Sequence, residues 1–294
     1  MDLSAWSRAI RSPQFVQLDR EISGRAIQTL CRISTCPNVH ECWSSGQVAL
    51  CVGGTGVAAA RSEVDQPPPL DGDEPGRVAA QIGPLGLGFV AIGGVALSSL
   101  PDAGAWLLAR SCLEVRRASP MTGVVLEVSD FAGKGQLSAE VIATKPQIFS
   151  HDLEVVPRLY AALRPGFDYQ RSLDVLAQAK GAGLVTKSHL SLGQDESLDE
   201  AVAVMDDLRS VGCDLLTLGQ HLTPKRWVKS EVFVELAKVA QQLGFTGVLA
   251  GTEVRSCYQM TQLWNQHTAN QESLGGEGSA AGSFPDSSSE PKLF

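Results

Sequence analysis

Long hydrophobic runs and an excess of positive charge are both absent from this sequence. The longest apolar stretch, residues 86–97 (GLGFVAIGGVAL), is interrupted by glycines and is too short to cross a bilayer, so we interpret it as a buried strand. The net charge is −8, and there is no basic stripe of the kind that binds phosphate backbones. We therefore expect neither a membrane nor a nucleic acid as a partner.

Targeting signals are also absent. The first residues, MDLSAWSRAIRSPQ, contain no apolar segment typical of a secretory signal and do not form a convincing transit peptide. The cysteines number seven, and an odd count in such a chain favours reduced thiols over disulfides. We expect a soluble intracellular protein of the cytoplasm or of an organelle matrix.

No G-x-G-x-x-G motif follows the first expected strand, so a dinucleotide-binding fold gains no support. Instead, short apolar runs alternate with amphipathic stretches. Strands are predicted at 87–93, 123–129, 146–150, 184–192, 214–219 and 246–251. Helices are predicted near 102–117, 136–144, 153–163, 170–182, 197–211 and 229–243. Strict alternation indicates parallel strands with right-handed crossovers, in an α/β fold that is either a partial barrel or an open doubly wound sheet.

The composition divides the chain into four zones. Residues 1–50 form a polar, cysteine-bearing N-terminal extension, and residues 51–83 are Gly/Ala-rich and then Pro/Asp-rich, with Asp73 predicted to cap a short helix at 74–82. Residues 84–267 hold the alternating strands and helices. Residues 268–294 are rich in Gly and Ser, which predicts a disordered tail.

Three cysteines lie close together in the N-terminal extension. The stretch LCRISTCPNVHECW contains Cys31, Cys36 and Cys42 with the spacing C-x₄-C-x₅-C. Zinc sites usually add a second Cys/His pair, which is missing here, whereas three thiolates with one further ligand suit a [4Fe–4S] cluster. On spacing alone, a metal site and a chance grouping of buried thiols remain equally open.

The residues around these cysteines resemble the auxiliary-cluster motif of lipoyl synthases, through CPN, ECW and Gly46. The resemblance continues in order over about residues 28–260. Its blocks are PPPLDGDEPGRVA, LPDAGA, EVVPRLY, RPGFDYQRSLDVLAQAK, TKSHLSLG, DDLRSVGCDLLTLGQHLTP and VRSCY. So many blocks in the same order are far more specific than the cysteine spacing alone.

This resemblance implies a radical S-adenosylmethionine enzyme on a partial (β/α)6 TIM-type barrel with two [4Fe–4S] clusters. Such an enzyme inserts sulfur at C6 and C8 of an octanoyl chain on a carrier-protein lysine, so octanoylated or lipoylated carrier domains are the implied partners. The implied auxiliary-cluster ligands are Cys31, Cys36, Cys42 and a serine of the family's R-S-S-Y motif. That motif reads Arg255, Ser256, Cys257 and Tyr258 here, which leaves Ser256 and Cys257 as alternatives for the fourth ligand.

The motif of the radical-generating cluster is missing. Where the family has C-x₃-C-x₂-C, a gapless comparison places Gly56, Ala60 and Glu63, which cannot hold four irons. The family's charged T-S-V-x-R-D-D segment is GGVALSS at 93–99, and a segment between Pro224 and 229 is deleted. We therefore expect a degenerate lipoyl synthase that keeps one auxiliary cluster, with doubtful S-adenosylmethionine binding and no catalytic residues assigned. The alternatives are an active enzyme whose residues 51–66 are misrepresented by the gene model, and a scaffold without metal.

Several further residues are candidates for a site. Lys187 matches a family lysine and is predicted either to bind an anion or to form a structural ion pair, and Arg255 is predicted to offset the cluster's charge. For the remaining candidates, a structural role is at least as plausible as a site role. These are His40, Glu41, Arg164, Tyr169, His189 and His221.

Overall fold

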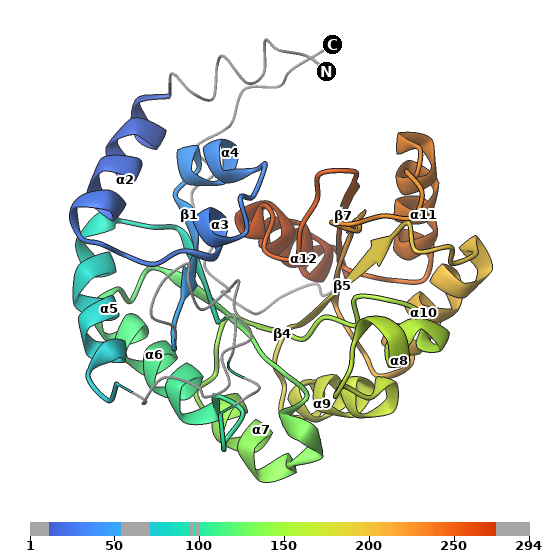
Figure 1. Cartoon of the computed structure of the whole chain (residues 1–294), viewed down its shortest axis with the longest axis horizontal. Coiled ribbons are helices and arrows are strands. Elements are labelled where there is room, and N and C mark those ends of the chain that lie inside the picture. The colour runs from blue at the N-terminus through green and yellow to red at the C-terminus, as the bar shows by residue number, and fades with distance from the viewer. Residues whose placement is uncertain (1–11, 54–70, 95–96, 98–99, 275–294) are drawn as a thin grey trace.

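The computed structural model describes residues 12–53, 71–94, 97 and 100–274. Its centre is a seven-stranded parallel sheet whose strands follow one another in chain order. The strands are β1 Gln47–Cys51, β2 Phe89–Gly93, β3 Gly123–Glu127, β4 Ile148–Ser150, β5 Thr186–Leu192, β6 Leu215–Gln220 and β7 Gly247–Gly251. Figure 1 shows a curved arrangement with helices around the outside of the strands. This confirms the predicted fold class, an α/β partial barrel of the TIM type.

Helices connect successive strands on the outer face of the sheet. They are α5 Glu74–Ile82, α6 Ala105–Ala118, α7 Gly135–Ile142, α9 Tyr169–Gly181, α10 Leu198–Ser210 and α11 Ser230–Gln242. The shorter elements are α8 Tyr160–Leu163 and the 3-10 turns η1 Gly83–Leu85, η3 Phe131–Gly133 and η4 Pro157–Leu159. The helix predicted over 153–163 is therefore wrong at its start, because Glu154 adopts a φ of 65°, and the helical part begins only at Pro157 as a 3-10 turn that leads into α8.

The first strand, β1, was not predicted. It is only five residues long and carries Gln47 and Cys51 in a cysteine-bearing region, so its apolar pattern is weak. All five residues are nevertheless buried, and they pair in register with β2 from Gln47–Phe89 to Cys51–Gly93. The sheet therefore has seven strands rather than six, and the boundary expected between residues 50 and 51 falls inside β1.

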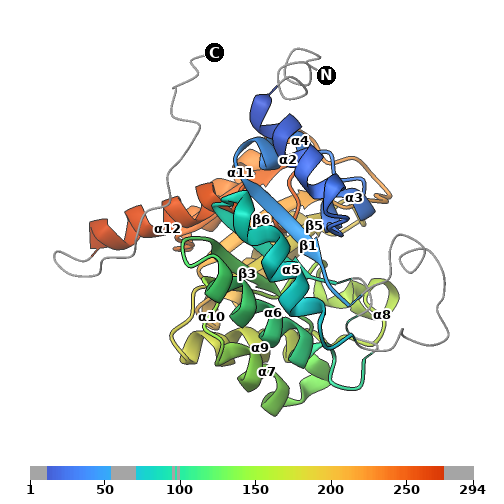
Figure 2. The ribbon, with the colours of Figure 1, turned by 90° about the vertical axis from the view of Figure 1, so that its left-hand side faces the viewer.

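Within the described residues, three helices precede the sheet and one follows it. The first three are α2 Pro13–Gly24, α3 Leu30–Ile33 and α4 Val39–Ser44, which Figure 2 shows grouped at one end of the molecule. The last is α12 Met260–Leu274, so the start of the tail expected at 268 falls within a helix. Residues 275–294, the rest of that expected tail, lie outside the described residues.

The helix α10 illustrates how the sequence pattern is realised. Ala201, Met205 and Leu208 are buried as the helical period predicts, but Leu198 at the helix start is half exposed. Ser197 caps the helix in a full capping box with Glu200. By contrast, Asp73 occupies the cap position of α5 without the expected side-chain bond, because its own backbone is already helical.

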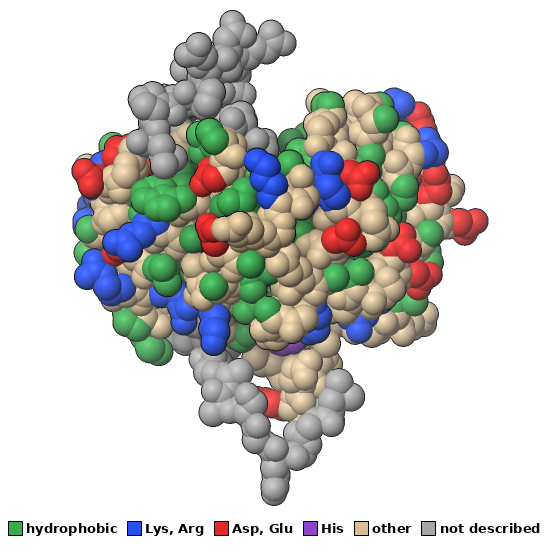
Figure 3. All heavy atoms as spheres, turned by 90° about the horizontal axis from the view of Figure 1, so that it is seen from below, with side chains coloured by type: hydrophobic (Ala, Val, Ile, Leu, Met, Phe, Trp, Pro, Cys, Tyr) green, Lys and Arg blue, Asp and Glu red, His purple; other side chains and the backbone are tan. Residues whose placement is uncertain are grey.

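Among the described residues, no helix combines the length and the apolar character needed to cross a bilayer. On the described part of the face in Figure 3, basic and acidic side chains are interspersed with apolar ones.

Candidate functional site

Four cysteine side chains line one pocket near the carboxyl end of the chain's last strand. Cys31, Cys36 and Cys42 come from the N-terminal extension, and Cys257 comes from the loop between β7 and α12. The other lining residues are Asn38, Val39, Gln47, Val48, Ala49, Arg255, Tyr258 and Met260. Its free volume is only about 10 Å³, so binding of any larger group requires the lining segments to move apart.

Hydrogen bonds across more than two hundred residues of sequence hold the two sides of this pocket together. Asn38 donates its side-chain N–H to the Glu253 carbonyl at 2.7 Å. The Tyr258 hydroxyl donates to the Glu41 carboxylate at 3.0 Å, so Glu41 is a structural partner. The buried Gln47 side chain accepts from the Thr261 backbone N–H at 3.0 Å. These contacts explain how Cys257 meets cysteines from the opposite end of the chain.

The four thiols share a low-dielectric environment. Burial raises the pKa of Cys31, Cys36 and Cys257, and raises that of Cys42 to about 12. The charges of the neighbouring thiols raise the pKa of Cys257 further, which places the four groups close together. Without a cation the thiols are therefore neutral, and a bound metal would displace their protons.

The type of metal centre that these thiols suit depends on their chemistry. Within the described ranges, no group of three His, Cys, Asp or Glu side chains is arranged to hold a single metal ion. A four-iron cluster spreads its thiolate ligands over separate iron corners, whereas a single ion draws them together. The donor set of four soft sulfur atoms in one pocket suits a thiolate-ligated centre, and a [4Fe–4S] cluster is one that these residues fit.

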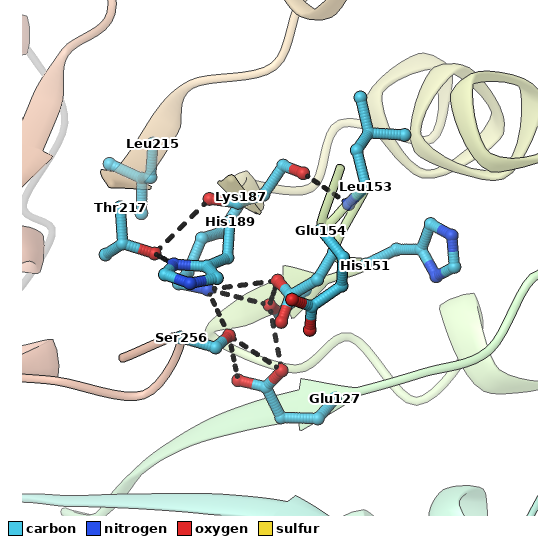
Figure 4. Close-up of polar contacts among 12 residues, drawn as sticks. Glu127, His151, Leu153, Glu154, Lys187, His189, Leu215, Thr217 and Ser256 are labelled. Carbon is cyan, nitrogen blue, oxygen red and sulfur yellow. Dashed lines mark hydrogen bonds and ion pairs between the residues drawn. The ribbon is translucent and has the colours of Figure 1, made fainter. Parts of the chain in front are cut away.

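Ser256 lies beside Cys257 in sequence but has different partners. Its hydroxyl accepts a hydrogen bond from the Lys187 ammonium at 2.7 Å and donates to the Glu127 carboxylate at 3.1 Å. Figure 4 shows Ser256 held between these two side chains. Ser256 is not among the residues that line the cysteine pocket.

Lys187, the second residue of β5, stands in a buried polar cluster with the residues that end β3 and β4. It is fully buried, and its ammonium group contacts Ser150 at 3.1 Å and Asp152 at 3.4 Å in addition to Ser256. Lys187 is therefore engaged in a buried ion pair. An anion-binding role would require a ligand to replace these partners.

Burial and the neighbouring charges shift the pKa of Glu127, Asp152 and Lys187 in this cluster. Burial raises the pKa of Glu127 to about 7, against the opposing effect of Lys187. Burial would also raise the pKa of Asp152, but Lys187 and His189 outweigh it and lower that pKa to about 2. Burial lowers the pKa of Lys187, yet the charges of Asp152 and Glu127 leave it raised overall, so the ammonium remains charged.

A chain of hydrogen bonds extends the cluster along β5 and β6. The His189 ring bonds to Thr217 at 2.9 Å and to Ser191 at 3.1 Å, and Ser191 donates to Glu154 at 3.1 Å. Burial lowers the pKa of His189 to about 4, so this ring is neutral near pH 7. Figure 4 shows the His151 ring pointing away from the cluster. His189 is thus a hydrogen-bonded core residue.

The other candidate residues have structural partners. Arg255 donates to the carbonyls of Gln220, Thr252 and Val254 while lining the cysteine pocket. The remaining candidates each contact a neighbouring side chain: His40 packs on Phe15, His221 accepts from Gln194, Tyr169 donates to Asp207, and Arg164 stacks over Phe167. Gly56, Ala60 and Glu63 lie outside the described residues.

No protein-family model matches the chain. The lipoyl synthase of Kineococcus radiotolerans is 41% identical over 271 residues, which cover 88% of this chain and 81% of that protein. The lipoyl synthase of Mycobacterium avium is 41% identical over 270 residues, which cover 88% of each chain. The chain belongs to the lipoyl synthase family. This confirms the family predicted from the ordered sequence blocks.

The solved structures are less similar to this lipoyl synthase family member than the curated relatives are. SuiB of Streptococcus suis bound to S-adenosylmethionine is 11% identical with a TM-score of 0.43, over 71% of this chain and 42% of that chain. A 2,3-dimethylmalate lyase is 14% identical with a TM-score of 0.43, over 67% of this chain and 74% of that chain. Because both TM-scores are 0.43, these similarities say nothing about the site.

Sequence reasoning missed one central residue of the polar cluster, Glu127. The available signal was a carboxylate at the end of an otherwise apolar strand, GVVLE, where barrels place functional groups. Its partner Ser150 also ends a strand, β4. Strand-end polar residues are therefore the pattern that would have found this cluster.

Proposed function

We propose that this chain is a lipoyl synthase family protein that holds a single [4Fe–4S] cluster on its N-terminal cysteines and acts by binding rather than by radical sulfur insertion. The observation that carries this proposal is the distribution of the seven cysteines. The donor set for one cluster is complete, and no second set remains.

The retained site is the cysteine pocket. Cys31, Cys36 and Cys42 line it together and would bind a cluster as thiolates once iron displaces their protons. Such a cluster supplies iron and labile sulfide. The protein's own contribution is to bury the site and to cross-link its two walls through the bonds from Asn38 and Tyr258.

The other three cysteines are too scattered to serve a second cluster. Cys51 ends β1, Cys112 lies within α6, and Cys213 precedes β6 with its sulfur bonded to backbone carbonyls. All three are buried in separate elements. Three thiolates on one loop are needed to leave an open iron for S-adenosylmethionine, and nothing in the sequence at 54–66 supplies them.

The region after β2 supports the same proposal. Leu97 takes the place of the arginine in the family's charged segment, and it is buried. It packs so closely that a Cβ built on Gly104 would lie 2.7 Å from the Leu97 Cβ, and one on Gly94 would lie 2.8 Å from its Cγ. The buried Leu97 thus supplies an apolar side chain at a position where binding of charged S-adenosylmethionine would need a polar one.

A binding role implies an exposed surface for the partner. Leu222 and Trp227, between β6 and α11, are 68% and 77% exposed. Trp227 also lines a cavity of about 240 Å³ together with Leu192 and Val228. Exposed aromatic residues beside a cavity are typical of interaction sites, and we propose an octanoylated or lipoylated carrier domain as the partner.

The experiment is anaerobic reconstitution of the full chain, followed by counting iron and sulfide. We expect about four irons per chain, and a Cys36→Ala variant should lose most of them. About eight irons, or formation of 5′-deoxyadenosine from S-adenosylmethionine and a reductant, would instead support an active enzyme. Sequencing the transcript across residues 47–75 tests whether the gene model misrepresents this region. No bound iron would support a scaffold without metal.

The partner is tested separately by titrating the chain with octanoylated, lipoylated and unmodified carrier domains in an isothermal titration calorimeter. We expect binding of the acylated domains, weakened in a Trp227→Ala variant. Equal binding of all three domains would refute recognition of the acyl chain.

A further inference from the structure

Two adjacent residues, Ser256 and Cys257, compete for the role of fourth ligand to the cluster, and the structure separates them. Only Cys257 lines the pocket formed by the three N-terminal cysteines. The Tyr258 N–H donates to the Arg255 carbonyl at 3.1 Å, so residues 255–258 form a tight turn. Successive side chains of this turn diverge, and the two candidates face different surroundings.

Ser256 is already committed to other partners. Its oxygen accepts from the buried Lys187 ammonium at 2.7 Å, and its proton is shared between the two oxygens of Glu127 at 3.1 and 3.3 Å. Ligation of iron would break these bonds and leave the Lys187 charge with one partner fewer in the interior. The cost of leaving a buried charged donor unsatisfied opposes such a rearrangement.

Cys257 has no such commitment among the described residues. Its side chain lines the same pocket as the other three cysteines. A thiolate is also a softer and stronger ligand for iron than a hydroxyl. Location and chemistry therefore agree on the same side chain.

Arg255 supplies a positive charge at the cysteine pocket. It lines the same pocket, and its Nε–H is buried without a hydrogen-bond partner, whereas its Nη1 is bonded to backbone carbonyls. A fourth thiolate adds one negative charge to the site, and the partly buried Arg255 guanidinium in the same pocket offsets that charge. The free Nε–H is a donor suited to a sulfur acceptor, as hydrogen bonds to cluster sulfurs commonly are.

We infer that Cys257, and not Ser256, is the fourth protein ligand, so that this chain holds its cluster through four thiolates with Arg255 as the compensating cation. This inference rests on the proposed function, because it assumes that the N-terminal cysteines hold a cluster. It goes further by assigning the fourth iron corner to a sulfur ligand. A cluster held in this way has no weakly bound corner from which iron is readily lost.

The test compares Cys257→Ser, Cys257→Ala and the matched control Ser256→Ala in the full chain reconstituted with iron and sulfide. Iron content is measured before and after a chelator is added, and ⁵⁷Fe Mössbauer spectra report whether one iron differs from the others. Far-ultraviolet circular dichroism confirms that each variant is folded.

We expect the parent chain and Ser256→Ala to give one uniform set of iron sites and equal resistance to the chelator. Cys257→Ser should show a distinct iron site, and both Cys257 variants should lose iron about tenfold faster or more. Unchanged iron retention in Cys257→Ala, or loss of iron in a folded Ser256→Ala, would overturn the inference while leaving the proposed function standing. If the parent chain binds no iron, both the inference and the proposed function fail.

Discussion

Replacing Lys187 by methionine should reveal the energetic role of the buried polar cluster. Methionine keeps much of the length and volume of lysine but removes the charge, and the site is fully buried. The Asp152 and Glu127 carboxylates would then remain in the interior without their cation. Breaking a buried ion pair by removing one partner costs about 3–5 kcal/mol.

The pKa of Asp152 gives an independent measure of this magnitude. Burial would raise that pKa, yet Lys187 and His189 lower it from 3.8 to about 2. At about 1.4 kcal/mol per unit, this difference corresponds to about 2–3 kcal/mol, the same order of magnitude. A lowered pKa means that the stabilisation is present above about pH 4 and is lost as the pH falls through 2. Without Lys187, burial raises the pKa instead, so the variant should become less stable as the pH rises.

The assay is urea unfolding of the parent and Lys187→Met at pH 5 and pH 8, followed by circular dichroism. We expect a loss of about 3–5 kcal/mol at pH 8 and a smaller loss at pH 5. Lys238→Met is the matched control, because Lys238 is exposed and pairs with Glu235 at 2.9 Å, and its loss should stay below about 1 kcal/mol. A variant as stable as the parent at pH 8, or an equal loss at both pH values, would refute the reasoning.

Three further substitutions test separate parts of the structure by the same unfolding assay. Burial raises the pKa of Glu127 from 4.5 to about 7, so the parent should lose stability as the pH rises through this range. Glu127→Gln removes the titrating group and should abolish up to about 3 kcal/mol of that loss. Parallel pH profiles of the parent and the variant would contradict this. Ser197→Ala removes the capping box of α10 and should cost about 1 kcal/mol, and a change within error would show that the cap contributes nothing. Leu208→Ala opens a cavity under the same helix and should cost about 2–5 kcal/mol, whereas a loss below that of Ser197→Ala would place Leu208 outside the core.

Most strands of the sheet were predictable because parallel strands are buried on both faces. Such strands appear as short, nearly continuous apolar runs, as in FVAIG of β2 and GVLAG of β7. β1 breaks this rule because Gln47 begins it, and that buried side chain bonds to the nearby Ser45 and also to Gln259 and Thr261. No local pattern reports a partner so distant in sequence.

The three N-terminal cysteines could be proposed as ligands from the sequence because their spacing and flanking residues are local features. A choice between Ser256 and Cys257 could not be made from the sequence, because it depends on which way two adjacent side chains point from a turn. The turn is fixed by the Tyr258–Arg255 backbone bond and by Tyr258 reaching Glu41. Both are tertiary consequences of how the N-terminal extension packs on the last strand.

Two departures from the family pattern, the missing C-x₃-C-x₂-C cysteines and Cys257 in place of a serine, can be explained together. A cluster that gives up sulfur must release iron, and a hydroxyl ligand permits this more readily than a thiolate. Under the proposed function, this chain lacks the cysteines for radical generation and does not start that reaction, so a releasable iron corner would serve no purpose. Under that condition a serine can be replaced by Cys257 without loss, and the replacement gains retention of the cluster. The loss of one cluster site and a firmer hold on the other are therefore consistent with a protein in which the remaining cluster is kept rather than consumed.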